Sequence, residues 1–120
     1  MKIAFSTSGE SLEARLDGRF GRAERFLVYD LDAGCARIVE NGLSAGSSQG
    51  AGIQAADTIA RSGAGAVVTG HCGPNAFRVL SHAGIRVYTC RARTVAEALE
   101  EFRAGKLVEQ SGPDVAGHHA

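Results

Sequence analysis

The stretch "VVTGHCGPNAFRVL", residues Val67–Leu80, decides the fold of this chain. Its start belongs to the apolar run "AGAVVTG", which is typical of a parallel strand buried on both faces. Pro74 then stands where the first turn of a helix tolerates a missing N–H group, and the apolar Phe77 and Leu80 predict a helix ending at Gly84. The strand "IRVYTC" follows, so we expect two parallel strands joined by a right-handed crossover.

The flanking segments predict a mixed sheet. β-branched and aromatic runs indicate strands at 2–8, 25–31 and 35–41. A short Asp/Gly connection makes the last two an antiparallel hairpin, whereas the polar stretches 9–24 and 42–52 are expected to be loops. The sequence thus predicts an α/β protein with about five strands, some antiparallel and some parallel, and helices packed on the sheet.

Two further helices are expected. The first runs from Ile53 to Ser62, with Ile53, Ala56, Ile59 and Ala60 on one apolar face. The other is marked by "TVAE", a capping box beginning at Thr94, and ends at Gly105.

Length and composition restrict the function classes. The 120 residues fit one domain, expected over residues 1–107 with a mobile tail at 108–120. The 13 Lys and Arg residues balance 13 Asp and Glu, so no overall field draws the chain to nucleic acid or an anionic membrane. We find no signal peptide and no apolar run of about 18 residues. Three cysteines cannot all pair within one chain, which favours free thiols in a reducing cytoplasm. We expect a monomer rather than an oligomer.

Ligands of open α/β sheets bind beyond the carboxyl ends of the parallel strands. The segments "STSGE", "TGHCGPN" and "TCRAR" should meet there. A helix begins directly after "GHCGP", so its free N–H groups and positive dipole end face the same space, which Gly70 and Gly73 let the backbone approach closely. The sequence therefore predicts an anion site with two soft ligand candidates. The side chains offered are Ser6, Thr7, Ser8, His71, Cys72, Cys90, Arg91 and Arg93.

Structural alternatives remain open for these residues. A free cysteine such as Cys90 is often just a small buried hydrophobic residue, His71 could hydrogen-bond a neighbouring loop, and the arginines could be solvated. A catalytic His71–Cys72 pair fits less well, because chain neighbours seldom face each other and no orienting acid is evident. The stretch "GAGIQA" at 50–55 matches a dinucleotide fingerprint, but it follows a polar loop where a strand is needed.

Several blocks resemble one known family. "DGRFGRAERFLVYDLD", "GAGIQAADTIARSGAGAVVTG", "GPNAF", "AGIRVY" and "TVAEALEEFRAGKL" are similar to the dinitrogenase iron-molybdenum cofactor biosynthesis family, the NifX-like group that includes the C-terminal segment of NifB proteins. The similarity extends to Leu107, and "GHCGPNAF" with the "PDVAGHH" tail is most similar to the orange protein subgroup. The resemblance implies a ribonuclease H-like, three-layer fold and a small metal-cluster carrier without catalysis of its own. It also implies a non-covalently held molybdenum–copper sulfide cluster, or a related molybdenum or iron–sulfur species, and P-loop ATPase partners of the MinD type.

The resemblance also places family motifs on this chain. "FGRA" falls on 20–23 and the "GPNA" block on 73–76. This adds to the candidate site Arg19, Gly21, Arg22 and Asn75. Many relatives carry His where this chain has Arg19, and the arginine adds a fixed positive charge that favours electrostatic holding of an anion. Cys72 and His71 are the candidates for direct contact with the metal. The second hypothesis is an interaction module for a MinD-type ATPase or a cofactor-assembly machine, with cluster binding incidental.

Overall fold

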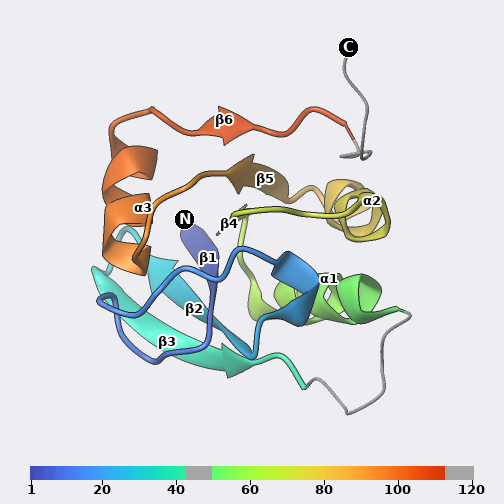
Figure 1. Cartoon of the computed structure of the whole chain (residues 1–120), viewed down its shortest axis with the longest axis horizontal. Coiled ribbons are helices and arrows are strands. Elements are labelled where there is room, and N and C mark those ends of the chain that lie inside the picture. Colours follow the sequence, from blue (N-terminus) through green and yellow to red (C-terminus); the bar gives the residue numbers. More distant parts are fainter. Residues whose placement is uncertain (43–49, 113–120) are drawn as a thin grey trace.

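The computed structural model describes residues 1–42 and 50–112 (Figure 1). Most of the loop expected at 42–52, and the His118–His119 tail, lie outside the described residues. The elements in chain order are β1 (Lys2–Thr7), the 3-10 helix η1 (Phe20–Arg22), β2 (Arg25–Asp30), β3 (Cys35–Glu40), α1 (Ala51–Ser62), β4 (Ala66–Thr69), α2 (Pro74–His82), β5 (Arg86–Thr89), α3 (Val95–Arg103) and β6 (Val108–Glu109).

The strands form one mixed sheet in the order β3-β2-β1-β4-β5-β6. β1 and β4 pair in parallel, as do β4 and β5, so the crossover predicted around α2 is present. β2 pairs antiparallel with β1 and with β3, which confirms the hairpin. The predicted α/β class with antiparallel and parallel strands is therefore confirmed.

The sheet has six strands where about five were expected. β6 pairs antiparallel with β5, and the N–H group of Gln110 donates to the Val87 carbonyl at 2.8 Å. Two residues are too short a run to show strand periodicity, so the sequence placed this segment in the tail. The division into a domain at 1–107 and a tail stays a prediction.

Helices cover both faces of the sheet, giving three layers (Figure 1). Side chains alternate along β1: Ala4 faces the core under α1 and α2, whereas Ile3 and Phe5 face the core under α3. Both cores consist mainly of aliphatic and small residues. This is the three-layer arrangement that the family resemblance implied.

α1 differs from its prediction in both its start and its buried face. It begins at Ala51, after Gly50 in a left-handed conformation with φ 80°. Ile53 is 44% exposed and Ala60 is also exposed, so these two do not face the core as predicted. The buried face consists of Ala51, Ala55, Ala56, Ile59 and Ser62. Ile53 is exposed because the helix start lines a pocket, where no sheet covers it.

The capping box of α3 is confirmed. The N–H group of Glu97 donates to Thr94 Oγ1 at 3.1 Å, and Glu97 Oε1 accepts from the N–H group of Arg93 at 3.0 Å. Two donors at the helix start are thus satisfied by side chains.

Across the described ranges, no helix is long and apolar enough to cross a membrane.

Candidate functional site

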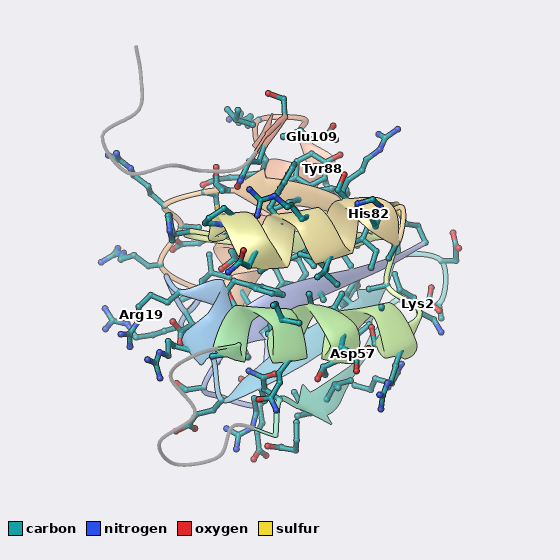
Figure 2. All side chains as sticks on the ribbon, turned by 90° about the vertical axis from the view of Figure 1, so that its right-hand side faces the viewer. Lys2, Arg19, Asp57, His82, Tyr88 and Glu109 are labelled. Carbon is teal, nitrogen blue, oxygen red and sulfur yellow. The ribbon has the colours of Figure 1, made fainter. Side chains whose placement is uncertain are left out.

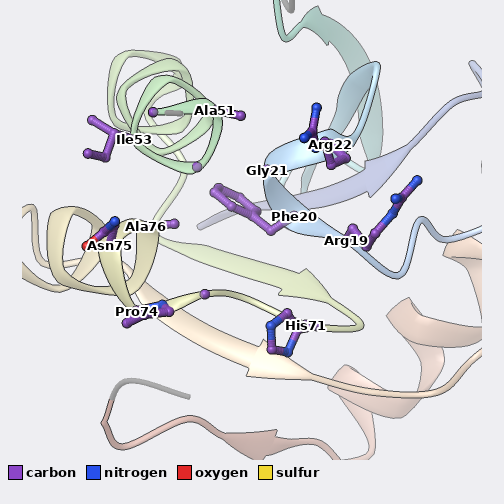
Figure 3. A pocket seen from close by; sticks show the side chains of 13 residues that line it. Arg19, Phe20, Gly21, Arg22, Ala51, Ile53, His71, Pro74, Asn75 and Ala76 are labelled. Carbon is purple, nitrogen blue, oxygen red and sulfur yellow. The ribbon is translucent and has the colours of Figure 1, made fainter. Parts of the chain in front are cut away.

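A pocket of about 650 Å³ opens at the edge of the sheet where the parallel strands end (Figure 3). Three segments build it: η1 with the residue before it, the first turn of α1, and the β4–α2 loop with the start of α2. Its lining residues are Arg19, Phe20, Gly21, Arg22, Gly50, Ala51, Gly52, Ile53, His71, Gly73, Pro74, Asn75 and Ala76. The pocket therefore lies at the edge predicted for ligand binding.

Small residues allow the three helix starts to converge. A Cβ on Gly21 would lie 3.0 Å from both Cα and N of Gly52, and a Cβ on Gly52 would lie 3.2 Å from the Cβ of Ala76. η1 is also tied to the β4–α2 loop, because the N–H group of Phe20 donates to the His71 carbonyl at 3.0 Å. Larger side chains at these positions would separate the walls of the pocket.

Both α-helix starts at the pocket are left without side-chain caps. Gly50 and Gly73 are the N-cap residues of α1 and α2, and neither helix has an acidic residue in its first turn. Figure 2 shows both helices beginning on the side where Arg19 projects. The first N–H groups of a helix have no intrahelical partners and carry its positive dipole end, so this edge attracts anions.

The lining side chains add positive charge and apolar surface. Arg19 and Arg22 are exposed, and neither guanidinium pairs with a carboxylate in the described residues. Figure 3 shows Arg19 and Arg22 on the η1 side, Ile53 on α1 and Asn75 on α2. Phe20 is buried and packs against Phe26, with ring centroids 5.3 Å apart. Among the residues that the structure describes, none of those lining the pocket is acidic.

The structure brings six of the predicted site residues to the pocket: Arg19, Gly21, Arg22, His71, Gly73 and Asn75. Ser6 and Thr7 are fully buried and hold the loop that follows β1. The Ser6 hydroxyl donates to the Asp17 carbonyl at 2.8 Å, and the Thr7 hydroxyl donates to the Arg15 carbonyl at 2.7 Å. These two hydroxyls therefore contact the loop and do not line the pocket.

The other predicted residues are absent from the lining of the pocket. Cys72 is fully buried in the core under α1 and α2, and Gly70 packs against Gly18. Cys90 packs on the α3 side of the sheet, where burial raises the pKa of its thiol, and Arg91 is exposed. Within residues 1–42 and 50–112, no three His, Cys, Asp or Glu side chains cluster as a metal-ion site.

The start of α1 contributes four lining residues that the sequence did not predict: Gly50, Ala51, Gly52 and Ile53. The signal for them was the "GAGIQA" match, set aside because no strand precedes it. In this fold the glycines still allow close backbone approach at a helix start, although the preceding element differs from the dinucleotide motif.

Residues 1–105 match the family model described as "Dinitrogenase iron-molybdenum cofactor". The chain belongs to this family. An uncharacterised protein of Methanocaldococcus jannaschii, also similar to this chain, is 33% identical over 110 residues, which cover 89% of either chain. Family membership confirms the resemblance found in the sequence.

Two solved structures similar to this one also match nearly the whole chain. The apo form of the orange protein from Desulfovibrio gigas is 42% identical with a TM-score of 0.89, and the match covers 95% of this chain and 96% of that one. A solution structure of a putative NifB protein from Thermotoga is 30% identical with a TM-score of 0.82, covering 97% and 98%. The expected likeness to the orange protein is therefore confirmed within the dinitrogenase iron-molybdenum cofactor family.

Proposed function

We propose that this protein is a small non-catalytic carrier that holds an anionic molybdenum-containing sulfide cluster non-covalently in the pocket. The observation that carries the proposal is the meeting of two uncapped helix starts with Arg19, Arg22 and His71 around a pocket to which the described residues contribute no carboxylate. Such a site stabilises negative charge through N–H donors and guanidinium groups.

A molybdenum–copper sulfide cluster suits the chemistry of the lining. Its sulfides are soft, polarisable and negatively charged, so they accept hydrogen bonds from N–H groups while tolerating the apolar Phe20 and Ile53. A metal already coordinated by sulfide needs few protein ligands, and His71 is the lining residue able to supply one. Cys72, whose side chain is fully buried, would contact the cluster only after a rearrangement. The name of the family, which mentions an iron-molybdenum cofactor, supports a molybdenum-containing species.

We further propose that the carrier works as a monomer in the cytoplasm, with P-loop ATPases of the MinD type as partners. The cytoplasmic assignment is supported by the free thiols of Cys35, Cys72 and Cys90.

The test is to mix metal-free protein with tetrathiomolybdate and copper(I), then pass it through gel filtration. We expect a visible charge-transfer band and metal that elutes with the protein. Hydrogen bonds to charged groups contribute about 1.5–3 kcal/mol each, so Arg19→Gln with Arg22→Gln should weaken binding by at least about tenfold. Arg61→Gln with Arg86→Gln removes equal charge elsewhere and should leave binding unchanged. No band and no retained metal in the wild type would reject the carrier function.

A second variant tests the helix start without weakening the fold. Gly73 has φ −69° and ψ 170°, and a Cβ there meets nothing within 4 Å. Gly73→Asp should therefore fit and cap α2, gaining about a few tenths of a kcal/mol. Its carboxylate would occupy the N–H groups and repel an anion, so metal uptake should fall while the melting temperature holds. Undiminished uptake by this variant would mean that the cluster binds elsewhere.

A further inference from the structure

Five arginines extend the positive charge of the pocket along the whole edge of the sheet. We call this set the arginine edge: Arg15, Arg19, Arg22, Arg91 and Arg93. They lie in the loop after β1, in η1, and in the segment after β5. The backbone brings these segments together, since the N–H group of Leu16 donates to the Arg93 carbonyl at 3.0 Å and that of Phe20 donates to the His71 carbonyl at 3.0 Å.

The arginine edge differs from the rest of the molecule in lacking partners. All five residues are exposed, and none of their guanidinium groups forms a hydrogen bond or ion pair with another described residue. The other six arginines each have a polar partner. These six are Arg25, Arg37, Arg61, Arg78, Arg86 and Arg103. Among the described residues, the unpaired arginines thus all lie on the segments that follow β1 and β5.

Two nearby carboxylates, Asp17 and Glu97, each accept a hydrogen bond from a backbone N–H group, and neither forms an ion pair with a described guanidinium group. Asp17 Oδ1 accepts from the N–H group of Arg19 at 2.9 Å, and Glu97 Oε1 accepts from the N–H group of Arg93 at 3.0 Å. Glu10 and Glu13 are exposed earlier in the same loop, so the surface has mixed charge with an excess of arginine.

We propose that the arginine edge is a docking surface for an acidic partner protein that covers the pocket. Arg19 and Arg22 line the pocket, whereas Arg15, Arg91 and Arg93 lie outside it. An anion bound inside the pocket would not reach these three, so a partner for them must be larger than a ligand of the pocket. Guanidinium groups bind carboxylates in a bidentate geometry and are enriched at protein interfaces. The docking surface does not depend on the proposed carrier function; only the transfer of a bound cluster to the partner does.

A protein surface fits this edge better than nucleic acid does. Ile53, 44% exposed at the pocket, offers an apolar contact of the kind found at the centre of protein interfaces. The chain as a whole carries no net positive charge, whereas nucleic-acid binding depends on neutralising many phosphates. A partner seated here would shield the pocket mouth from water during transfer.

The experiment measures fluorescence anisotropy with a fluorescein-labelled oligoglutamate peptide at low salt, beside an oligothymidylate of equal charge. The outer variant carries Arg15→Gln, Arg91→Gln and Arg93→Gln. The control variant carries Arg61→Gln, Arg86→Gln and Lys106→Gln and has the same net charge. Three exposed ion pairs lost together should weaken peptide binding about tenfold in the outer variant, and less than about twofold in the control. Amide shifts on peptide addition should map to residues 14–19 and 90–94.

Equal losses of peptide affinity in the two variants would overturn the inference, because binding would then depend only on net charge. No peptide binding by the wild type would overturn it as well. Tighter binding of oligothymidylate through the same arginines would overturn it in favour of nucleic acid. The outer variant should still take up tetrathiomolybdate with copper, because its three residues lie outside the pocket. Loss of peptide binding therefore stays distinguishable from failure of the carrier function.

Discussion

Gly70 is the position where one methyl group should distort both the fold and the site. It packs backbone to backbone against Gly18, so a Cβ on Gly70 would lie 2.7 Å from the Gly18 Cα and 2.9 Å from its carbonyl oxygen. Carbon atoms reach comfortable contact at about 3.5 Å, so the two loops must separate by roughly 0.8 Å. Because both sides of the contact are backbone, no side chain can turn away to relieve it.

The expected cost follows from that geometry. Overpacking a tight contact costs about 1–3 kcal/mol, and a contact with backbone on both sides belongs in the upper half of that range. For a chain of this length, 1 kcal/mol lowers the melting temperature by about 4 °C, so Gly70→Ala should melt about 8–12 °C below the wild type. Gly18→Ala is a matched control, since a Cβ on Gly18 meets nothing within 4 Å and should change stability by less than about 0.5 kcal/mol.

Thermal unfolding followed by circular dichroism measures both variants, and tetrathiomolybdate uptake reports on the site. Gly70 precedes His71, whose carbonyl holds the N–H group of Phe20, so the displacement should reach η1 and weaken uptake in Gly70→Ala. Equal melting temperatures for the two variants would refute the reasoning, because the predicted asymmetry arises only from this packing.

Three other predictions address stability and reactivity away from the pocket. The Asp30 carboxylate accepts hydrogen bonds from two backbone N–H groups of its turn, chiefly that of Ala33, and these lower its pKa in the folded protein. The ionised carboxylate therefore stabilises the folded state above the unfolded pKa, and this stabilisation is lost as the pH falls through the folded pKa. Urea midpoints should therefore fall less on acidification in Asp30→Asn than in the wild type, and an equal fall would contradict this. Thr94→Ala should remove the α3 cap and lower the melting temperature by about 4 °C, whereas Thr94→Ser should not, as calorimetry can check. Burial raises the pKa of the Cys90 thiol, so iodoacetamide should label it more slowly than the exposed Cys35, and mass spectrometry showing equal rates would count against this.

The sequence predicted the parts of the fold that depend on local chemistry. The hairpin follows from its Asp/Gly turn, the parallel pair from a buried apolar run before and after α2, and α3 from its capping box. The edge of the sheet that carries the pocket followed from strand direction alone. These signals are readable because each is carried by a few adjacent residues.

What the sequence missed depends on contacts between distant segments. β6 is too short for periodicity and exists because β5 offers an open edge. Ser6 and Thr7 were expected at the pocket, but the loop after β1 folds back over them and its carbonyls accept from their hydroxyls. Ile53 was expected in the core, because a 3.6-residue pattern cannot tell a face against the sheet from a face against a pocket.

The three α-helices differ in how their N-termini are capped, and the difference separates α3, which does not line the pocket, from α1 and α2, which do. α3 begins with Thr94 and Glu97, which satisfy donors at its start. α1 and α2 begin with Gly50 and Gly73, which satisfy none, although a side chain at Gly73 would fit sterically. A capping side chain at Gly73 would add about a few tenths of a kcal/mol, and Gly50 adopts a left-handed φ of 80°, so the uncapped starts agree with the anion site that we propose. In the proposed carrier, the backbone N–H groups that these glycines leave uncapped would bind the anion together with the arginines around them.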